Sequence, residues 1–171
     1  MREIVFGLED SLVSTLGTIT GIAVGTNSQY VVILSGAVLL ASEAMSMAAG
    51  SYLSSKRAFQ AEAVFHDHGG AHNAEAPRPL RAALVMGTCY VAGGFIPLAF
   101  YLFLPVASAV IPAVILTAAS LFLVGVWAAS FTKTSKWKSG LEMTAVSLAA
   151  AAAGYLIGRG VGAAFGVAVV L

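Results

Sequence analysis

The sequence predicts an all-α protein, a five-helix transmembrane bundle that forms a single domain over residues 1–171. Of these residues, 58% are hydrophobic and 10% are charged, whereas about 25% are charged in a typical soluble domain. Apolar runs long enough to cross a bilayer, which takes about 20 helical residues, follow one another along the chain. A chain of this size has no room for a large soluble domain beside several spans. Its function must therefore be built from the helices and one loop.

Residues from about 6 to 26 are expected to form the first span. Glu9 and Asp10 interrupt its start, unlike the basic and then uninterrupted apolar layout of a cleaved signal peptide, so we expect a retained helix. Asp10 shares a helical face with glycines that let another helix approach closely. These glycines are Gly17, Gly21 and Gly25. Asp10 can lie at the mouth of that helix-helix seam, or at the membrane surface as a carboxylate favoured by the helix macrodipole; for Glu9 we expect the surface.

The second span is expected at about 30–57, and it carries an ionisable group at mid-membrane. Glu43 is the only charged residue between Tyr30 and Leu53. A carboxylate at the bilayer centre costs about 2.5–3.5 kcal/mol on insertion scales, so it usually faces a polar path or a partner. Met47 follows one turn later on the same face, which adds a soft sulfur ligand to a hard oxygen ligand. Glu43 is thus either a metal ligand or a structural group bonded to a neighbouring helix.

Residues 58–81 are polar and are expected to form a loop on the cytosolic side. The loop contains all three histidines of the chain among several carboxylates, and Pro77 and Pro79 end it. Histidine and carboxylate ligands suit divalent Fe, Mn, Zn or Ni, although the spacing lacks a recognised zinc signature. A solvated loop would have the same composition. The candidate metal ligands are Glu62, His66, Asp67, His68 and His72.

Three further spans are expected at about 82–104, 106–131 and 142–168. The first two carry no charge, and the last has glycines at four-residue spacing, which is a second seam for close helix packing. Arg159 lies within this seam and is expected to reach the far membrane surface, with pairing to Glu43 as the alternative. Cys89 is the only cysteine, so the chain has no disulfide framework and no thiolate metal cluster.

The basic residues predict the orientation of the bundle. With a cytosolic N-terminus, every lysine and arginine except Arg159 falls on the cytosolic side, as the positive-inside rule requires. These residues are Arg2, Lys56, Arg57, Arg78, Arg81, Lys133, Lys136 and Lys138. A cation could then pass Asp10, Met47 and Glu43 in turn. The lack of a targeting segment favours a prokaryotic inner membrane, or a vacuolar-type membrane in a eukaryote.

The histidine positions argue against a membrane enzyme. No histidine lies in any expected span, so paired-histidine haem ligation, a Ser/His dyad and a zinc HExxH site each lack an essential residue. We therefore expect no enzymatic activity, no cofactor and no nucleic-acid partner. A non-transporting scaffold, assembled through the glycine seams with Glu43 locking the helix register, remains the alternative to a transporter.

Four stretches of the sequence carry a resemblance to a known family. They are DSLVSTLG at 10–17, MSMAAGSYLSSK at 45–56, GGFIPL at 93–98 and SGLEM at 139–143. In these stretches the chain resembles the vacuolar iron transporters and their prokaryotic relatives, five-helix proteins that export ferrous iron or manganese from the cytosol. The resemblance implies a homodimer, with the metal path at the subunit interface and lined by the first two helices. It also implies coupling to a proton gradient, with Asp10 and Met47 as path residues.

The chain departs from the family pattern at three places. Ser11 stands where the family usually has glycine, and Leu39 stands where plant members have the second-helix glutamate, so Glu43 is a same-face substitute. The long glutamate-rich cytosolic region of the family is reduced to the histidine loop. The resulting hypothesis is a secondary transporter of Fe²⁺ or Mn²⁺ that exchanges the metal for protons. Sulfur favours transition metals over Mg²⁺ and Ca²⁺, and a buried glutamate can alternate between metal-bound and protonated states.

Overall fold

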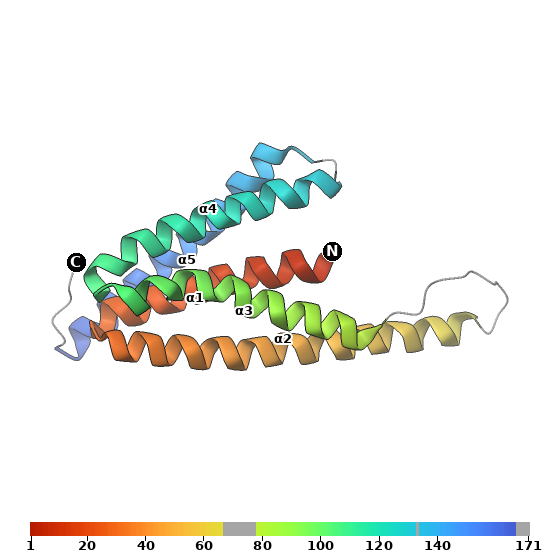
Figure 1. Ribbon diagram of the computed structural model, residues 1–171, viewed down its shortest axis with the longest axis horizontal. Coiled ribbons are helices and arrows are strands. Elements are labelled where there is room, and N and C mark those ends of the chain that lie inside the picture. The colour runs from red at the N-terminus through yellow and green to blue at the C-terminus, as the bar shows by residue number, and fades with distance from the viewer. Residues whose placement is uncertain (67–77, 133, 167–171) are drawn as a thin grey trace.

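The computed structural model is all-α, and it describes residues 1–66, 78–132 and 134–166, with the backbone alone for 62–66 (Figure 1). Its five helices confirm the predicted class. Four of them, α2 to α5, are long and apolar enough to cross a membrane, whereas α1 is not among these four. The helices are α1 (Arg2–Thr26), α2 (Gln29–His66), α3 (Pro79–Phe103), α4 (Val106–Thr132) and α5 (Lys136–Ala164).

The helices differ from the predicted spans mainly at their ends. Helix α2 continues past residue 57 to His66, so the expected loop begins later than residue 58. The added stretch begins Ala58-Phe59-Gln60-Ala61, which contains no glycine or proline to end a helix in water. Helix α5 begins at Lys136, before the expected residue 142, and ends at Ala164. Hydropathy marks the apolar part of a helix, and these two helices continue beyond it.

Helix α1 is the central helix, because it packs against each of the other four. Several of its apolar side chains are almost fully enclosed by those neighbours. They include Leu12, Leu16, Ile19, Ala23 and Val24. A helix surrounded by protein meets little lipid, so α1 can carry Glu9, Asp10 and many hydroxyl groups at a lower cost than a helix on the rim of the bundle.

The two glycine seams predicted from the sequence pair with each other inside one chain. A Cβ atom added at Gly21 would lie 2.9 Å from the carbonyl oxygen of Gly154, and one added at Gly25 would lie 3.0 Å from that of Gly158. A Cβ atom at Gly154 would collide with the carbonyl oxygen of Gly17. The backbones of α1 and α5 therefore touch, and only glycine allows this approach.

A second close contact holds α3 against both α1 and α2. A Cβ atom at Gly93 would collide with the Ser11 hydroxyl of α1, and one at Gly94 would collide with the Leu40 side chain of α2. Both glycines are buried. The Gly93-Gly94 pair thus marks where three helices converge, and the candidate functional residues lie beside this point.

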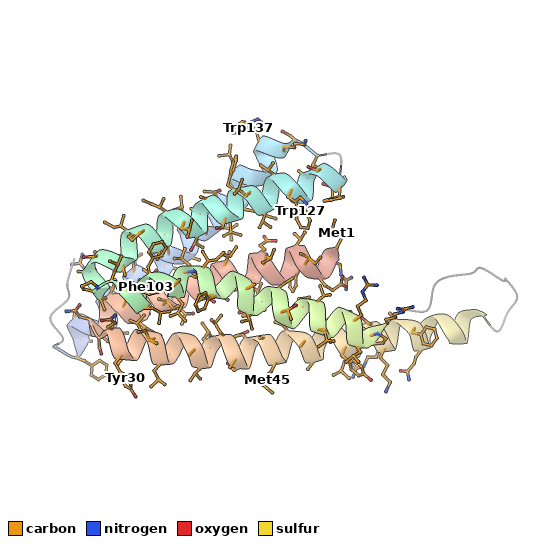
Figure 2. The ribbon with its side chains drawn as sticks, in the orientation of Figure 1. Met1, Tyr30, Met45, Phe103, Trp127 and Trp137 are labelled. Carbon is orange, nitrogen blue, oxygen red and sulfur yellow. The ribbon has the colours of Figure 1, made fainter. Side chains whose placement is uncertain are left out.

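The two ends of the bundle carry the residues expected at membrane surfaces. Helix direction alternates along the chain, and Met1, Trp127 and Trp137 lie at one end while Tyr30 and Phe103 lie at the other (Figure 2). Tryptophan and tyrosine favour the membrane-water interface. Most described basic residues belong to helix termini at the Met1 end, namely Arg2, Arg78, Arg81, Lys136 and Lys138, whereas Lys56 and Arg57 lie inside α2 before its end at His66.

A substitution in the glycine seam tests the α1–α5 contact. We expect Gly154→Ala to lower the free energy of unfolding by about 1–3 kcal/mol or more, because the new methyl group meets backbone that can yield only if the helices separate. Gly160→Ala on the same helix is the control, since an added Cβ meets nothing within 4 Å there. Thermal unfolding of the purified protein in detergent measures both. Equal melting temperatures for the two variants would contradict the contact.

Candidate functional site

The candidate residues lie where α1, α2 and α3 meet. Helix α2 approaches α3 at two levels: Leu40 packs against Gly94, and the Ala44 carbonyl oxygen would lie 3.5 Å from a Cβ atom at Gly87. Tyr90 lies between these two levels on α3 and belongs to the same buried cluster as Leu40 and Ala44. Glu43 precedes Ala44, which places its backbone on α2 at about the level of Tyr90.

Tyr90 connects the two carboxylate-bearing helices. Its side chain is fully buried, with 0% exposure, and a hydrogen bond of 2.7 Å joins its hydroxyl oxygen to the Ser14 Oγ of α1. Ser14 follows Asp10 by one turn on α1. The carboxylates of Asp10 and Glu43 both lie near enough to the Tyr90 hydroxyl to act on it electrostatically. Only Ser14 bonds to this buried hydroxyl, whereas Asp10 and Glu43 act on it through their charge from two different helices. We call Asp10, Ser14, Glu43 and Tyr90 the polar cluster.

No described lysine or arginine forms an ion pair with a carboxylate of the polar cluster. Within the part of the chain that the structure describes, the ion pairs lie elsewhere: Arg2 contacts Glu3 at 3.8 Å, and Lys138 contacts Glu142 at 3.9 Å. Arg159 bonds instead to the Tyr155 hydroxyl of its own helix at 3.2 Å, so its alternative pairing with Glu43 is not observed. The half-buried carboxylates Asp10 and Glu43 are thus not neutralised by a described lysine or arginine.

Met47 lines a cavity of about 560 Å³ between α2, the start of α1 and the start of α3. The same cavity is lined by Met86, which sequence reasoning did not single out. Met86 lies one turn before Tyr90 in an uncharged span, and that i, i+4 spacing of a thioether and a hydroxyl is the signal that could have identified both. We call this space the sulfur cavity; the hydroxyl-bearing residues that line it are Ser46, Ser51 and Ser54.

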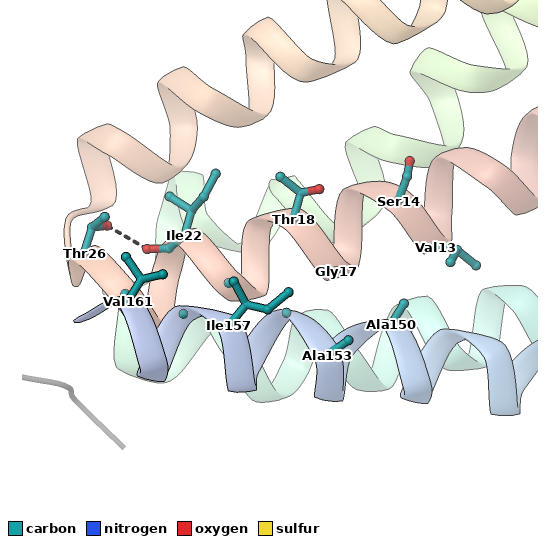
Figure 3. A pocket seen from close by; sticks show the side chains of 14 residues that line it. Val13, Ser14, Gly17, Thr18, Ile22, Thr26, Ala150, Ala153, Ile157 and Val161 are labelled. Atoms are coloured by element: carbon teal, nitrogen blue, oxygen red, sulfur yellow. Dashed lines mark hydrogen bonds between the residues drawn. The ribbon is translucent and has the colours of Figure 1, made fainter. Parts of the chain in front are cut away.

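A second space, a groove of about 600 Å³, follows the α1–α5 seam on the other side of the polar cluster (Figure 3). Ser14 belongs to both the groove and the cluster. The exposed Thr18 and Thr26 add hydroxyl groups along α1, whereas Ile157 and Val161 supply apolar walls from α5. The polar cluster therefore lies between two spaces along α1. The sulfur cavity is near the N-terminus of α1, and the groove runs toward the C-terminus of α1.

For the predicted metal ligands of the histidine segment, the structure describes at most the backbone. Glu62 and His66 belong to the last turns of α2, where the backbone alone is described, and Asp67, His68 and His72 lie outside the described residues. Among the described residues, no three or more His, Cys, Asp or Glu side chains are grouped so that they could hold a metal ion. The candidate site thus depends on pairs of carboxylates and thioethers from different helices.

Comparison with known proteins gives these residues a family context. The sequence profile described as the VIT family matches residues 1–65 and 55–159, which together cover most of the chain. The chain belongs to the VIT family. The predicted resemblance is thereby confirmed, and VIT family membership supports metal transport across a membrane.

Two plant proteins named vacuolar iron transporter 1 are similar to this VIT family chain. The Eucalyptus grandis protein is 27% identical over 94% of this chain and 86% of its own length, and the Arabidopsis thaliana protein is 26% identical over 93% and 85%. The first alignment extends over 214 positions, more than the 171 residues of this chain, so that relative carries residues that this chain lacks. The two parts of the family match overlap at residues 55–65, near the end of α2.

The Tyr90–Ser14 hydrogen bond is testable by its effect on stability. We expect Tyr90→Phe to lower the free energy of unfolding by about 1–3 kcal/mol, because the bond is lost and the part-buried Ser14 Oγ is left unpaired. Tyr101→Phe is the matched control, since the Tyr101 hydroxyl is buried without a hydrogen-bond partner among the described residues. Unfolding of both variants in detergent, with Ser14→Ala completing a double-mutant cycle, measures the bond. A coupling energy near zero would contradict it.

Proposed function

We propose that this VIT family protein is a secondary transporter that exports Fe²⁺ or Mn²⁺ from the cytosol in exchange for protons. The observation that carries this proposal is the polar cluster, in which carboxylates of two helices act by their charge on one buried hydroxyl and have no described cationic partner. Unpaired carboxylates at membrane depth are costly and usually serve an ion path. Similarity to proteins named vacuolar iron transporter 1 supports a metal as the ion.

The chemistry of the cluster suits a metal that is exchanged for protons. Asp10 and Glu43 offer hard oxygen ligands, and Met47, one turn from Glu43, offers a soft sulfur ligand that favours transition metals over Mg²⁺ and Ca²⁺. When the metal leaves, two carboxylates would keep their charge in a medium of low dielectric constant, which is unfavourable. Protons that bind to them remove that charge. Metal release and proton uptake would therefore be linked at the same side chains.

The proposed direction of transport depends on a cytosolic N-terminus. The described basic residues at helix termini near Met1 support this orientation by the positive-inside rule. The histidine segment would then face the cytosol, where Glu62, His66, Asp67, His68 and His72 could bind the metal before it enters the path. A prokaryotic inner membrane, or a vacuolar-type membrane in a eukaryote, is the proposed location.

We further propose a homodimer with the path between its two copies. The groove along α1 is open on one side and carries the exposed hydroxyl-bearing Thr18, so a second copy could complete its wall. The glycine seams are used within one chain, where they bind α1 to α5. This internal use removes the main support for a scaffold that assembles through glycine seams.

Conservative substitutions of the path residues should reduce metal flux. In proteoliposomes we expect Asp10→Asn, Glu43→Gln and Met47→Leu each to lower Fe²⁺ or Mn²⁺ flux by about tenfold or more, since one ligand to the ion is worth more than about 1.4 kcal/mol. Flux is measured with and without a pH gradient. Glu142→Gln is the control, because that carboxylate is exposed and pairs with Lys138 away from the cluster.

The folded state of each variant is checked by its elution volume and melting temperature. Normal metal flux in both Glu43→Gln and Met47→Leu would refute the proposal that the ion passes these two side chains. Metal flux that does not respond to a pH gradient in the unsubstituted protein would leave metal transport in place and refute the exchange with protons.

The proposed dimer is tested by cross-linking across its twofold axis. In a Cys89→Ser background, we expect Thr18→Cys to form covalent dimers with a short thiol cross-linker in membranes, because Thr18 lies on the open side of α1. Ala119→Cys, at an exposed position of α4, is the control and should remain monomeric. Equal cross-linking at both positions, or none at Thr18→Cys, would contradict an interface at α1.

A further inference from the structure

The sulfur cavity has an unusual set of ligands for a cation. Two thioethers, Met47 from α2 and Met86 from α3, line it together with the three serine residues named above. Among the described residues that line it there is no carboxylate, and the one charged side chain is that of Arg2. The Arg2 side chain is 84% exposed and contacts Glu3, so its charge is directed toward solvent and partly balanced. The interior of the cavity therefore offers neutral ligands, of which sulfur is the strongest for a soft metal.

The packing of α2 on α3 places both thioethers at one level. A Cβ atom at Gly87 would lie 3.3 Å from the Cβ of Ala48, and these are the residues that follow Met86 and Met47. The two methionines therefore flank one close helix contact and line the same cavity beside it. Met86 is 7% exposed, and Met47 is half-buried against the core.

Gly7 of α1 makes room for the Met86 sulfur. A Cβ atom at position 7 would lie 3.2 Å from Met86 Sδ, which is closer than side chains normally approach. The absence of a side chain at this position lets the thioether lie between α1 and α3 at the edge of the cavity. All three helices that form the polar cluster thus also shape the sulfur cavity.

We propose that Met47 and Met86 form a thioether pair that binds soft and borderline transition-metal cations and makes Met86 a specificity-determining residue. This inference deepens the proposed transport function. A cation held by thioethers and hydroxyls has no carboxylate to compensate for its lost hydration, so Mg²⁺ and Ca²⁺ are disfavoured. A soft monovalent ion such as Ag⁺ needs no charged ligand. A metal that has passed this pair meets Glu43 one turn further along α2.

Titration with silver nitrate tests the pair independently of transport. Isothermal titration calorimetry is done on the purified protein in detergent, in chloride-free buffer and in a Cys89→Ser background, so that the thiol does not bind the probe. We expect Met86→Leu and Met47→Leu each to weaken Ag⁺ binding by tenfold or more, since leucine keeps the volume but removes the sulfur. Met45→Leu should bind Ag⁺ like the parent, because Met45 is 74% exposed and points away from the bundle (Figure 2).

Several results would overturn the thioether pair. They are unchanged Ag⁺ affinity in Met86→Leu, an equal loss in Met45→Leu, or Mg²⁺ binding that competes with Ag⁺. If Met86→Leu does not fold, Met47→Leu at its half-buried position decides the question. Fe²⁺ and Mn²⁺ flux is measured in parallel. If silver binding depends on both methionines but the protein shows no metal flux, the transport function is refuted and the thioether pair stands. If the protein shows flux but silver binding does not depend on the methionines, the thioether pair is refuted and the transport function stands.

Discussion

The backbones of α1 and α5 touch at glycines, and this contact holds the helix that carries Glu9 and Asp10 at the centre of the bundle. Each carbonyl oxygen of Gly154 and Gly158 lies where a side chain on α1 would otherwise stand. With α5 so close, α1 also contacts α2, α3 and α4. A helix that carries Asp10, Ser11 and Thr15 would be costly on the lipid side of a bundle, and central placement lowers that cost because Ser11 and Thr15 are fully buried.

The polar cluster shows what this central position makes possible. Asp10 and Glu43 come from different helices, yet the charges of both act on the Tyr90 hydroxyl of α3, which is hydrogen-bonded to Ser14 of α1. A structural role for Glu43 would call for a lasting cationic or hydrogen-bonding partner, and the described residues supply no ion pair to it. The arrangement suits a carboxylate whose partner is a transient ion, which is why the family's metal transport fits this chain.

The ligands change in character along α1 and α2. Near the N-terminus of α1 the sulfur cavity offers thioethers and hydroxyls, and one turn deeper the polar cluster offers carboxylates. Selection and charge compensation would then occur at separate places. Soft ligands can discriminate between metals without holding them tightly, and the carboxylates can then bind the ion or a proton. A short chain could in this way retain selectivity although its relatives carry residues that it lacks.

The sequence by itself determined the all-α class, four of the five apolar spans, and the residues Asp10, Glu43 and Met47 as candidates, because hydropathy and helical spacing are local properties. The family followed from the resemblance of four short stretches. The sequence also predicted two glycine seams, but only the tertiary structure decided that they face each other, since the pattern specifies a close approach and not a partner. Tyr90 and Met86 became visible only once α3 was placed against α1 and α2. Likewise, α2 continues to His66 because helices extend beyond the apolar region that hydropathy detects. Contacts between residues far apart in the chain depend on which helix faces pack together. The pattern of residues within one helix does not say which face of another helix it will meet.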